Sequence, residues 1–179
     1  MPAKKISILL LFGLIASGIM ILVIIGTWLS GPEAFLGWPV WLGKSLVILL
    51  AAMATVAEKR VRGGALDFRS ALRVAFGVMV MGILAANLFV WLIVNVIDPH
   101  FYQRLLPLIV DSAEQWYRRL GAPQDQIRAQ LDYIRTHNQF SLGSVVIGMG
   151  RDLLLFGIIA ILIAVTVKSK KVPTPKPGP

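Results

Sequence analysis

Four long apolar runs, separated by short polar stretches, dominate the hydrophobic pattern of this chain. They cover about residues 6–29, 40–57, 71–97 and 142–167. An apolar run of about 18 residues or more is long enough to cross the hydrocarbon core of a bilayer as a helix. The first run exceeds the roughly 7–15 residues of a signal-peptide core, and no small-residue cleavage site follows it. The pattern therefore predicts an all-α membrane protein with four transmembrane helices.

The lysines and arginines between the runs indicate how the helices cross the membrane. Two precede the first run, five lie in residues 58–73 and four follow the last run, whereas residues 30–39 contain none. Short connections rich in Lys and Arg stay in the cytoplasm. Both termini and residues 58–73 are therefore predicted to be cytoplasmic. On this basis residues 1–171 form one transmembrane domain, and residues 172–179 form a proline-rich cytoplasmic tail.

The segment 98–140 then becomes an extracytoplasmic insert between the third and fourth helices. Its apolar residues recur at helical spacing in two stretches separated by Gly121-Ala122-Pro123. Its five arginines and five acidic residues give a formal charge of zero. We predict an amphipathic helical insert that either lies on the membrane or docks on protein. The candidate docking face consists of four apolar residues: Phe101, Leu105, Ile109 and Trp116.

The amino-acid composition excludes several kinds of ligand and of catalytic chemistry. The chain is 56% hydrophobic and carries a net charge of +9. The excess of lysine and arginine lies beside the apolar runs. It therefore indicates the orientation of the helices in the membrane rather than a surface that binds nucleic acid. With no cysteine, disulfides, thiolate metal sites and thiol catalysis are excluded. The chain has no phosphate-binding glycine loop, nucleophile elbow or metal-type histidine spacing. We predict no catalytic residue, cofactor or metal, and hence no enzyme.

A few polar residues interrupt the apolar runs and are the candidates for a functional site. Ionisable groups in a transmembrane helix are costly and usually face protein or water. Most of these residues fall in the predicted outer half of the membrane, where they could form one cluster. Such a cluster could bind a lipid headgroup or a partner's helix, or it could simply fix the bundle. The members are Lys44, Asn87, Asn95, Arg151 and Asp152.

Several segments resemble those of a family of membrane proteins common in Bacteroidota, the domain-of-unknown-function 4199 family. The third run is entered through Asp67-Phe68-Arg69-Ser70-Ala71-Leu72-Arg73 and left through Asp98-Pro99-His100-Phe101. The helical insert carries Gly121-Ala122-Pro123, and the last run ends in Lys168-Ser169-Lys170-Lys171. The resemblance covers nearly the whole chain. It implies a bacterial inner-membrane protein of four spans, and it brings no catalytic residues with it.

Three functional interpretations remain open at this stage. The first is a non-catalytic accessory or scaffold subunit that joins a membrane-protein partner or a second copy of itself. The second is a small transporter, channel or lipid-handling protein that uses the polar cluster. The third is an enzyme acting on a lipid-linked substrate, or the membrane partner of such an enzyme. All three place the protein in the lipid bilayer of the bacterial inner membrane, without nucleic acid.

Overall fold

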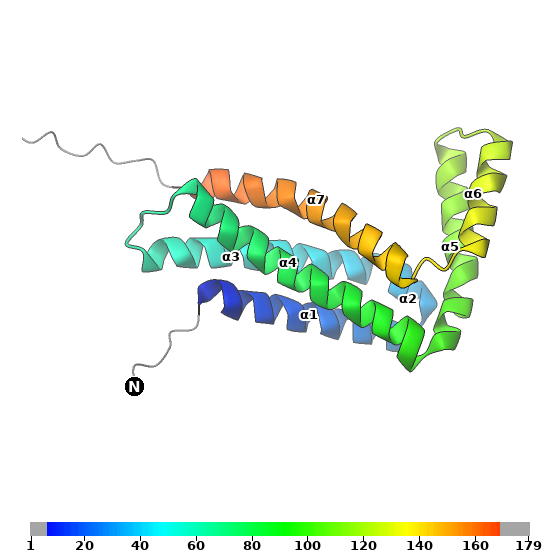
Figure 1. Cartoon of the computed structure of the whole chain (residues 1–179), viewed down its shortest axis with the longest axis horizontal. Helices are drawn as coiled ribbons and strands as arrows, with labels where there is room; N and C mark the ends of the chain where they lie inside the picture. Colours follow the sequence, from blue (N-terminus) through cyan, green and yellow to red (C-terminus); the bar gives the residue numbers. More distant parts are fainter. Residues whose placement is uncertain (1–6, 169–179) are drawn as a thin grey trace, which may run out of the picture.

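The protein is an antiparallel bundle of four long helices with a helical hairpin across one end (Figure 1). The computed structural model describes residues 7–168; the predicted tail 172–179 lies outside this range, as do the terminal lysines other than Lys168. No strand occurs among the described residues. The four bundle helices are long and apolar enough to cross a membrane. They are α1 (Ile8–Ser30), α3 (Trp38–Val61), α4 (Phe68–Leu92) and α7 (Leu142–Val167). A π-helical turn, η1 (Ile93–Ile97), extends α4. The predicted fold class, all-α with four such helices, is confirmed.

The observed helices differ from the predicted spans mainly at their ends. Helix α3 continues beyond residue 57 to Val61 because Glu58, Lys59 and Arg60 are good helix formers, although they are too polar for the apolar pattern. Lys59 Nζ donates to the carbonyl of Val167 at 2.8 Å, so the end of α3 also caps the end of α7.

The connection predicted over residues 30–39 contains a short helix, α2 (Pro32–Leu36). Pro32 occupies its first position, where a missing N–H costs nothing, and Gly37 follows its last residue. Its buried residue Phe35 packs edge-on against Phe101, with 5.1 Å between the ring centroids. This short helix therefore ties the first connection of the bundle to the hairpin.

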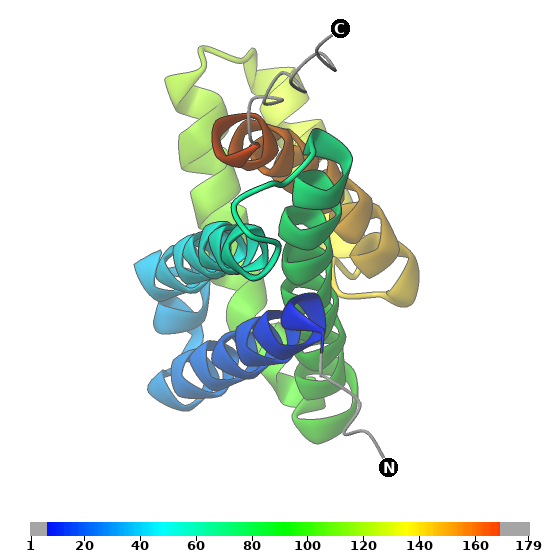
Figure 2. The same ribbon diagram turned by 90° about the vertical axis from the view of Figure 1, so that its left-hand side faces the viewer.

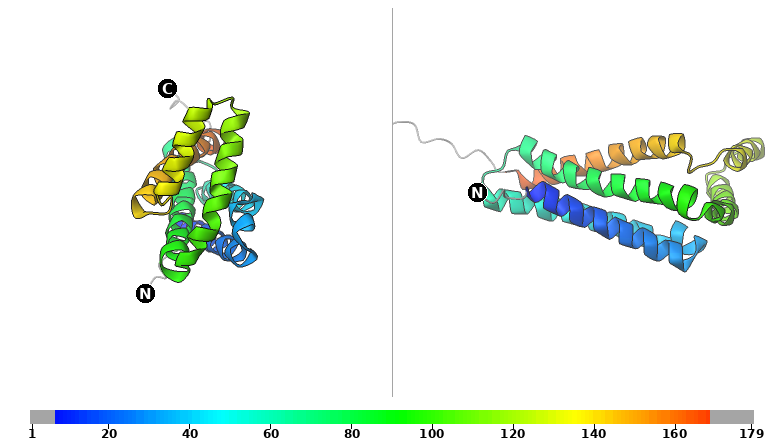
Figure 3. Two further views of the ribbon diagram at one scale, coloured as in Figure 1. Left: turned by 90° about the vertical axis from the view of Figure 1, so that its right-hand side faces the viewer. Right: turned by 60° about the horizontal axis from the view of Figure 1, so that its bottom comes forward.

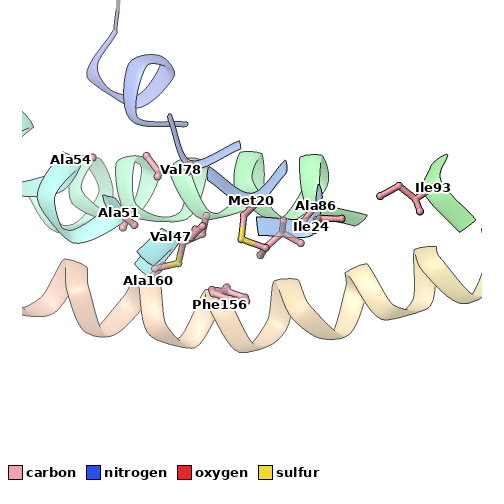
Figure 4. Packing of buried hydrophobic residues seen from close by; sticks show 14 of the residues in the cluster. Met20, Ile24, Val47, Ala51, Ala54, Val78, Ala86, Ile93, Phe156 and Ala160 are labelled. Carbon is pink, nitrogen blue, oxygen red and sulfur yellow. The ribbon is translucent and has the colours of Figure 1, made fainter. Parts of the chain in front are cut away.

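Helix α4 is the centre of the bundle, because it packs on α1, α3 and α7 (Figure 1). The side chains between these helices are mostly small or aliphatic (Figure 4). Small residues allow helix backbones to approach closely, so that van der Waals packing can replace the hydrophobic effect, which is absent between helices in lipid. The alanines of this core with no exposed surface are Ala16, Ala51, Ala54, Ala75 and Ala160.

Three glycines of the spans lie at helix crossings, where an added Cβ would be crowded by a neighbouring helix. A Cβ added at Gly13 would lie 2.3 Å from Met81 Sδ, and one at Gly77 would lie 2.7 Å from Leu9 Cδ1. A Cβ added at Gly82 would lie 3.2 Å from the nearest methyl of Val47. Other glycines of the spans have no atom within 4 Å of an added Cβ: Gly18, Gly143, Gly148 and Gly150.

Asp67 is the N-cap of α4, and its ionisation makes the stability of the start of this helix depend on pH. The Ser70 N–H donates to its carboxylate at 3.0 Å. Hydrogen bonds from the Ser70 side chain and backbone lower the pKa of Asp67 below its ordinary value of 3.8. A carboxylate with a lowered pKa stabilises the folded state above the unfolded-state pKa, and this contribution is lost as pH falls through the folded-state pKa.

We therefore expect the wild-type chain to lose stability in acid partly through Asp67. Asparagine caps a helix about as well as aspartate but does not titrate. Asp67→Asn should keep most of the stability at neutral pH and show a shallower fall below about pH 4. The measurement is the unfolding midpoint in detergent between pH 3 and pH 7, with Asp67→Ala as the variant that lacks a cap throughout. Superimposable pH curves for the wild type and Asp67→Asn would contradict this role.

Between η1 and α7 the chain forms the helical hairpin, built from α5 (Pro99–Arg119) and α6 (Gln124–Thr136). The two helices pack through a small core of their own, formed by Val110, Ile127 and Leu131. The hairpin runs across the bundle axis and extends sideways past the bundle on the side of α7 (Figures 1 and 3).

The two described ends of the chain, at the start of α1 and the end of α7, lie at the opposite end of the bundle from the hairpin (Figures 1 and 2). The α3–α4 connection lies at that same opposite end, whereas α2 lies at the hairpin end (Figure 1). The bundle therefore has two distinct ends, one bearing the described chain ends and one bearing the hairpin.

Candidate functional site

An ion pair within the bundle joins α3 to α7. Lys44 Nζ lies 3.4 Å from the nearer carboxylate oxygen of Asp152 and 3.5 Å from the other. The side chains are 28% and 13% exposed, so the pair is largely enclosed by the protein. Lys44 Nζ also lies 5.3 Å from the centroid of the Trp41 ring, within cation–π range. Two of the five predicted cluster residues are therefore in direct contact.

This pair lies in the half of the bundle nearer to the hairpin. Lys44 is six positions after Trp38, the first residue of α3, which places it about 9 Å along the helix. Trp38 and Trp41 are 72% and 68% exposed, as expected for aromatic residues at a membrane interface. The ion pair therefore lies below the interface that these tryptophans mark.

Arg151 is next to Asp152 on α7 but does not join the ion pair. Adjacent residues of a helix point about 100° apart, and Arg151 is exposed. Within residues 7–168 no hydrogen bond or ion pair engages its guanidinium. A single arginine at the centre of a transmembrane helix costs about 2.5–3.5 kcal/mol on insertion scales, less when its long side chain reaches the interface. Arg151 thus leaves one net positive charge beside the neutral Lys44–Asp152 pair.

The two asparagines of the predicted cluster have separate environments. Asn87 donates to the carbonyl of Ile83 one turn earlier, at 3.0 Å, and lines the same cleft as Lys44. Asn95 donates to the carbonyls of Trp91 at 2.9 Å and Phe140 at 3.0 Å. It thereby fastens the chain just before α7 to η1 and does not line the cleft. Asn95 is a structural residue, whereas Asn87 belongs to the site.

The cleft has a volume of about 350 Å³ and contacts helices α1, α2, α3, α4 and α7. Polar groups are confined to Lys44, Asn87, Arg151 and Asp152, and the remaining walls are apolar. The apolar side chains that reach furthest into the bundle include Met20, Ile24, Val47, Ile83 and Phe156. Nothing in the hydrophobic pattern distinguishes these residues from ordinary core positions, so the sequence did not single them out.

A second hollow, of about 630 Å³, lies between α3 and α7 and shares its three charged residues with the cleft, while Ser45 lines the second hollow alone. Lys44, Arg151 and Asp152 border both, and the second hollow is completed by apolar residues such as Ile48, Leu155 and Ile159. Leu155 and Ile158 are exposed on the outside of α7. The ion pair therefore lies between the interhelical cleft and a groove that opens on the outside of the bundle.

The predicted docking face of the insert is buried at one end and exposed at the other. Phe101 and Leu105 have no exposed surface, because they pack into the bundle core near Phe35. Ile109 is partly buried against the same core, and Trp116 is 58% exposed. The base of this face is thus covered by the chain itself, and only its outer part is free.

The cleft brings together groups that can hold an anion. Two cations, one carboxylate and one amide converge in apolar surroundings. No serine or histidine lines the cleft itself, and Ser45 lines the adjoining hollow between α3 and α7. Across the described residues no group of three or more His, Cys, Asp or Glu side chains could hold a metal ion.

Four helices that are long and apolar enough to cross a membrane define a multi-pass membrane protein. Comparison with known families assigns the chain more closely. Residues 11–169 match the family described as "Protein of unknown function (DUF4199)", so the chain belongs to that family and the resemblance inferred from the sequence is confirmed. No curated protein and no solved structure matches the chain.

Proposed function

We propose that this protein is a non-catalytic inner-membrane protein of bacteria that binds the anionic headgroup of a lipid or lipid-linked molecule. The binding site is the cleft between α3, α4 and α7. The observation that carries the proposal is Arg151, a cation that borders both hollows and has no partner within residues 7–168.

The charge balance of the site favours an anionic ligand. Lys44 and Asp152 neutralise each other, and Arg151 remains as a net positive charge. A guanidinium presents a planar fork that suits a phosphate or carboxylate group bidentately. A phosphate bound there would remove the cost of an unpaired cation below the interface. Arg151 is therefore the primary contact for the headgroup, with Lys44 as the second charge.

The shape of the site favours an amphiphile over a free anion. The volume of about 350 Å³ falls in the range of small-molecule sites, and most of the lining is apolar. The groove between α3 and α7 continues from the polar residues along apolar side chains that include Ile48, Leu155 and Ile159. An acyl or isoprenoid chain would lie along these residues while its headgroup contacts Arg151.

The orientation proposed for the protein places this site in the outer leaflet. The cytoplasmic location of both termini and of residues 58–73 is supported by the distribution of lysine and arginine along the sequence. The two described chain ends and the α3–α4 connection lie at one end of the bundle, which agrees with that distribution (Figure 1). The ligand would therefore come from the periplasmic leaflet of the inner membrane.

Lipid retention tests this proposal directly. The wild type, Arg151→Gln and Arg73→Gln would be purified gently from native membranes, and bound lipids identified by mass spectrometry. Arg73 is the matched control, because it is exposed at the far end of α4 and does not border either hollow. We expect a phosphate-bearing lipid to be retained by the wild type and by Arg73→Gln but reduced severalfold in Arg151→Gln. Equal retention by all three would reject the proposal.

A second candidate, an accessory subunit of a larger membrane assembly, is favoured by the exposure of α7. Only 11% of its apolar window is buried within the chain, compared with 39% for the third span. Gly143, Gly148 and Gly150 leave room for a close approach on this helix. The same purification addresses this candidate: a protein partner at stoichiometric amounts, with no retained lipid, would replace lipid binding as the primary function.

A further inference from the structure

The hairpin presents one face toward the bundle, and that face continues beyond the bundle. Phe101 and Leu105, near the start of α5, are fully buried against the bundle. Trp116 follows Leu105 by eleven positions, which is about three complete turns of an α-helix. Trp116 therefore projects from the same side of α5 as Leu105, about 16 Å farther along the axis. It is 58% exposed, so the outer part of this face has no cover.

The other sides of α5 either pack on α6 or carry charged residues. The side facing α6 carries Val110 in the small hairpin core, with Ala113 and Tyr117 packed against it. The side facing away carries exposed charges, including Asp111 and Arg118. The free apolar side therefore differs from both the α6 contact and the solvent face.

The level of this free face relative to the bilayer follows from two observations. Phe35 contacts Phe101 at the base of α5, and it lies three residues before Trp38, whose exposed ring begins span α3. Tryptophans at span ends mark the membrane interface, so α5 starts at the interface level. The hairpin runs across the spans rather than along them (Figures 1 and 3). Its outer half consequently runs parallel to the membrane surface beside the bundle.

The chemistry of the free face suits a lipid surface. Trp116 and Leu120 are 58% and 61% exposed, and Arg119 is three positions after Trp116 on the same side. An amphipathic ring at the headgroup level with an adjacent guanidinium is the combination that holds helices in the interface. Residues 98–140, which include the hairpin, have a formal charge of zero, so contact would come from these local groups rather than from general attraction to anionic lipid.

From this geometry we infer that the outer half of α5 lies in the lipid interface beside the bundle, with Trp116 as its anchor. The occupant of the free face is the lipid headgroup layer. The hairpin thereby covers the surface of the bilayer next to α7, and the side of α5 that carries Asp111 and Arg118 faces the water. This surface does not depend on ligand binding at Arg151.

Spin labels can test this placement because the chain has no cysteine of its own. A nitroxide would be attached at Ser112→Cys, which shares the side of Trp116, and separately at Asp111→Cys, the adjacent residue on the solvent side. Both positions are exposed, so neither label should disturb the core. The full chain would be reconstituted in nanodiscs of phosphatidylethanolamine and phosphatidylglycerol. Collision rates with oxygen, which dissolves in lipid, and with a water-soluble nickel chelate would then be compared.

We expect the ratio of oxygen to nickel collisions to be severalfold higher at position 112 than at position 111. Adding Trp116→Ser should reduce the ratio at position 112, because the anchor is lost. Equal ratios at the two positions, with free access of the nickel chelate, would overturn the inference. So would a label at position 112 that is accessible to nickel in nanodiscs but shielded in native membranes, since a protein would then be the occupant.

Discussion

Gly82→Leu is expected to destabilise the bundle by about 1–3 kcal/mol, because the site cannot accept a larger side chain. Even a Cβ at this position would lie 3.2 Å and 3.3 Å from the two methyls of Val47 and 3.5 Å from Ala16 Cβ. These neighbours come from α3 and α1, so three helices would have to move apart. The free energy of unfolding, measured by titrating mixed micelles with a denaturing detergent, would report the loss.

Gly18→Leu is the matched control for this prediction. Gly18 also lies within a transmembrane helix, but a Cβ there would meet no atom within 4 Å, and the residue is exposed. The substitution adds the same side chain without crowding, so its effect on stability should be small. Equal losses for the two variants would show that Gly82 is not held at a tight crossing.

The Lys44–Asp152 pair should show strong energetic coupling between the two residues. Removing either partner leaves the other as an unpaired charge in a largely enclosed site. We expect Lys44→Met and Asp152→Leu each to destabilise the bundle by about 2 kcal/mol. The double variant should be more stable than the sum of the single losses predicts, because it leaves no charge behind. A double-mutant cycle on the free energy of unfolding measures this difference.

An exposed ion pair provides the comparison for this cycle. Arg118 and Glu114 are one turn apart on α5, with 2.7 Å between Arg118 Nη2 and Glu114 Oε1, and both side chains are at least one third exposed. Exposed pairs of this kind contribute about 0.3–0.5 kcal/mol. Glu114→Gln should therefore have little effect. Additive single and double losses at Lys44 and Asp152 would mean that the intramembrane pair contributes no more than such a surface pair.

The sequence predicted the spans well because hydrophobic length is a local property. The four apolar runs became four helices, and the two helical patterns of the insert became α5 and α6. The main omission was α2, since five residues are too few to show a helical period. The ends of α3 and α4 were also missed by a few residues, because charged residues and the Asp67 cap extend helices beyond the apolar pattern.

The candidate site was predicted less completely because it depends on how the helices pack. Sequence position identified Lys44, Asn87, Arg151 and Asp152, and the fold brings all four to one cleft. It could not show that Lys44 pairs with Asp152 rather than with a separate neighbour, or that Asn95 bonds to the carbonyl of Phe140 and does not line the cleft itself. Nor could it show that Phe101 and Leu105 would be buried against the bundle, with Phe101 in contact with Phe35 of α2. Each of these outcomes is a contact between helices, which a single-helix pattern does not contain.

The π-helical turn η1 determines the direction, around the axis of α4, in which the hairpin leaves the bundle. The N–H of Asp98 donates to the carbonyl of Ile93, five residues earlier, at 2.8 Å, so this turn holds one residue more than an α-helical turn. Each residue of an α-helix adds about 100° of rotation. Without the extra residue, Pro99 would leave α4 at a different azimuth, and the hairpin would swing to another flank of the bundle. A single backbone position thus determines which neighbours in the plane of the membrane the hairpin can reach.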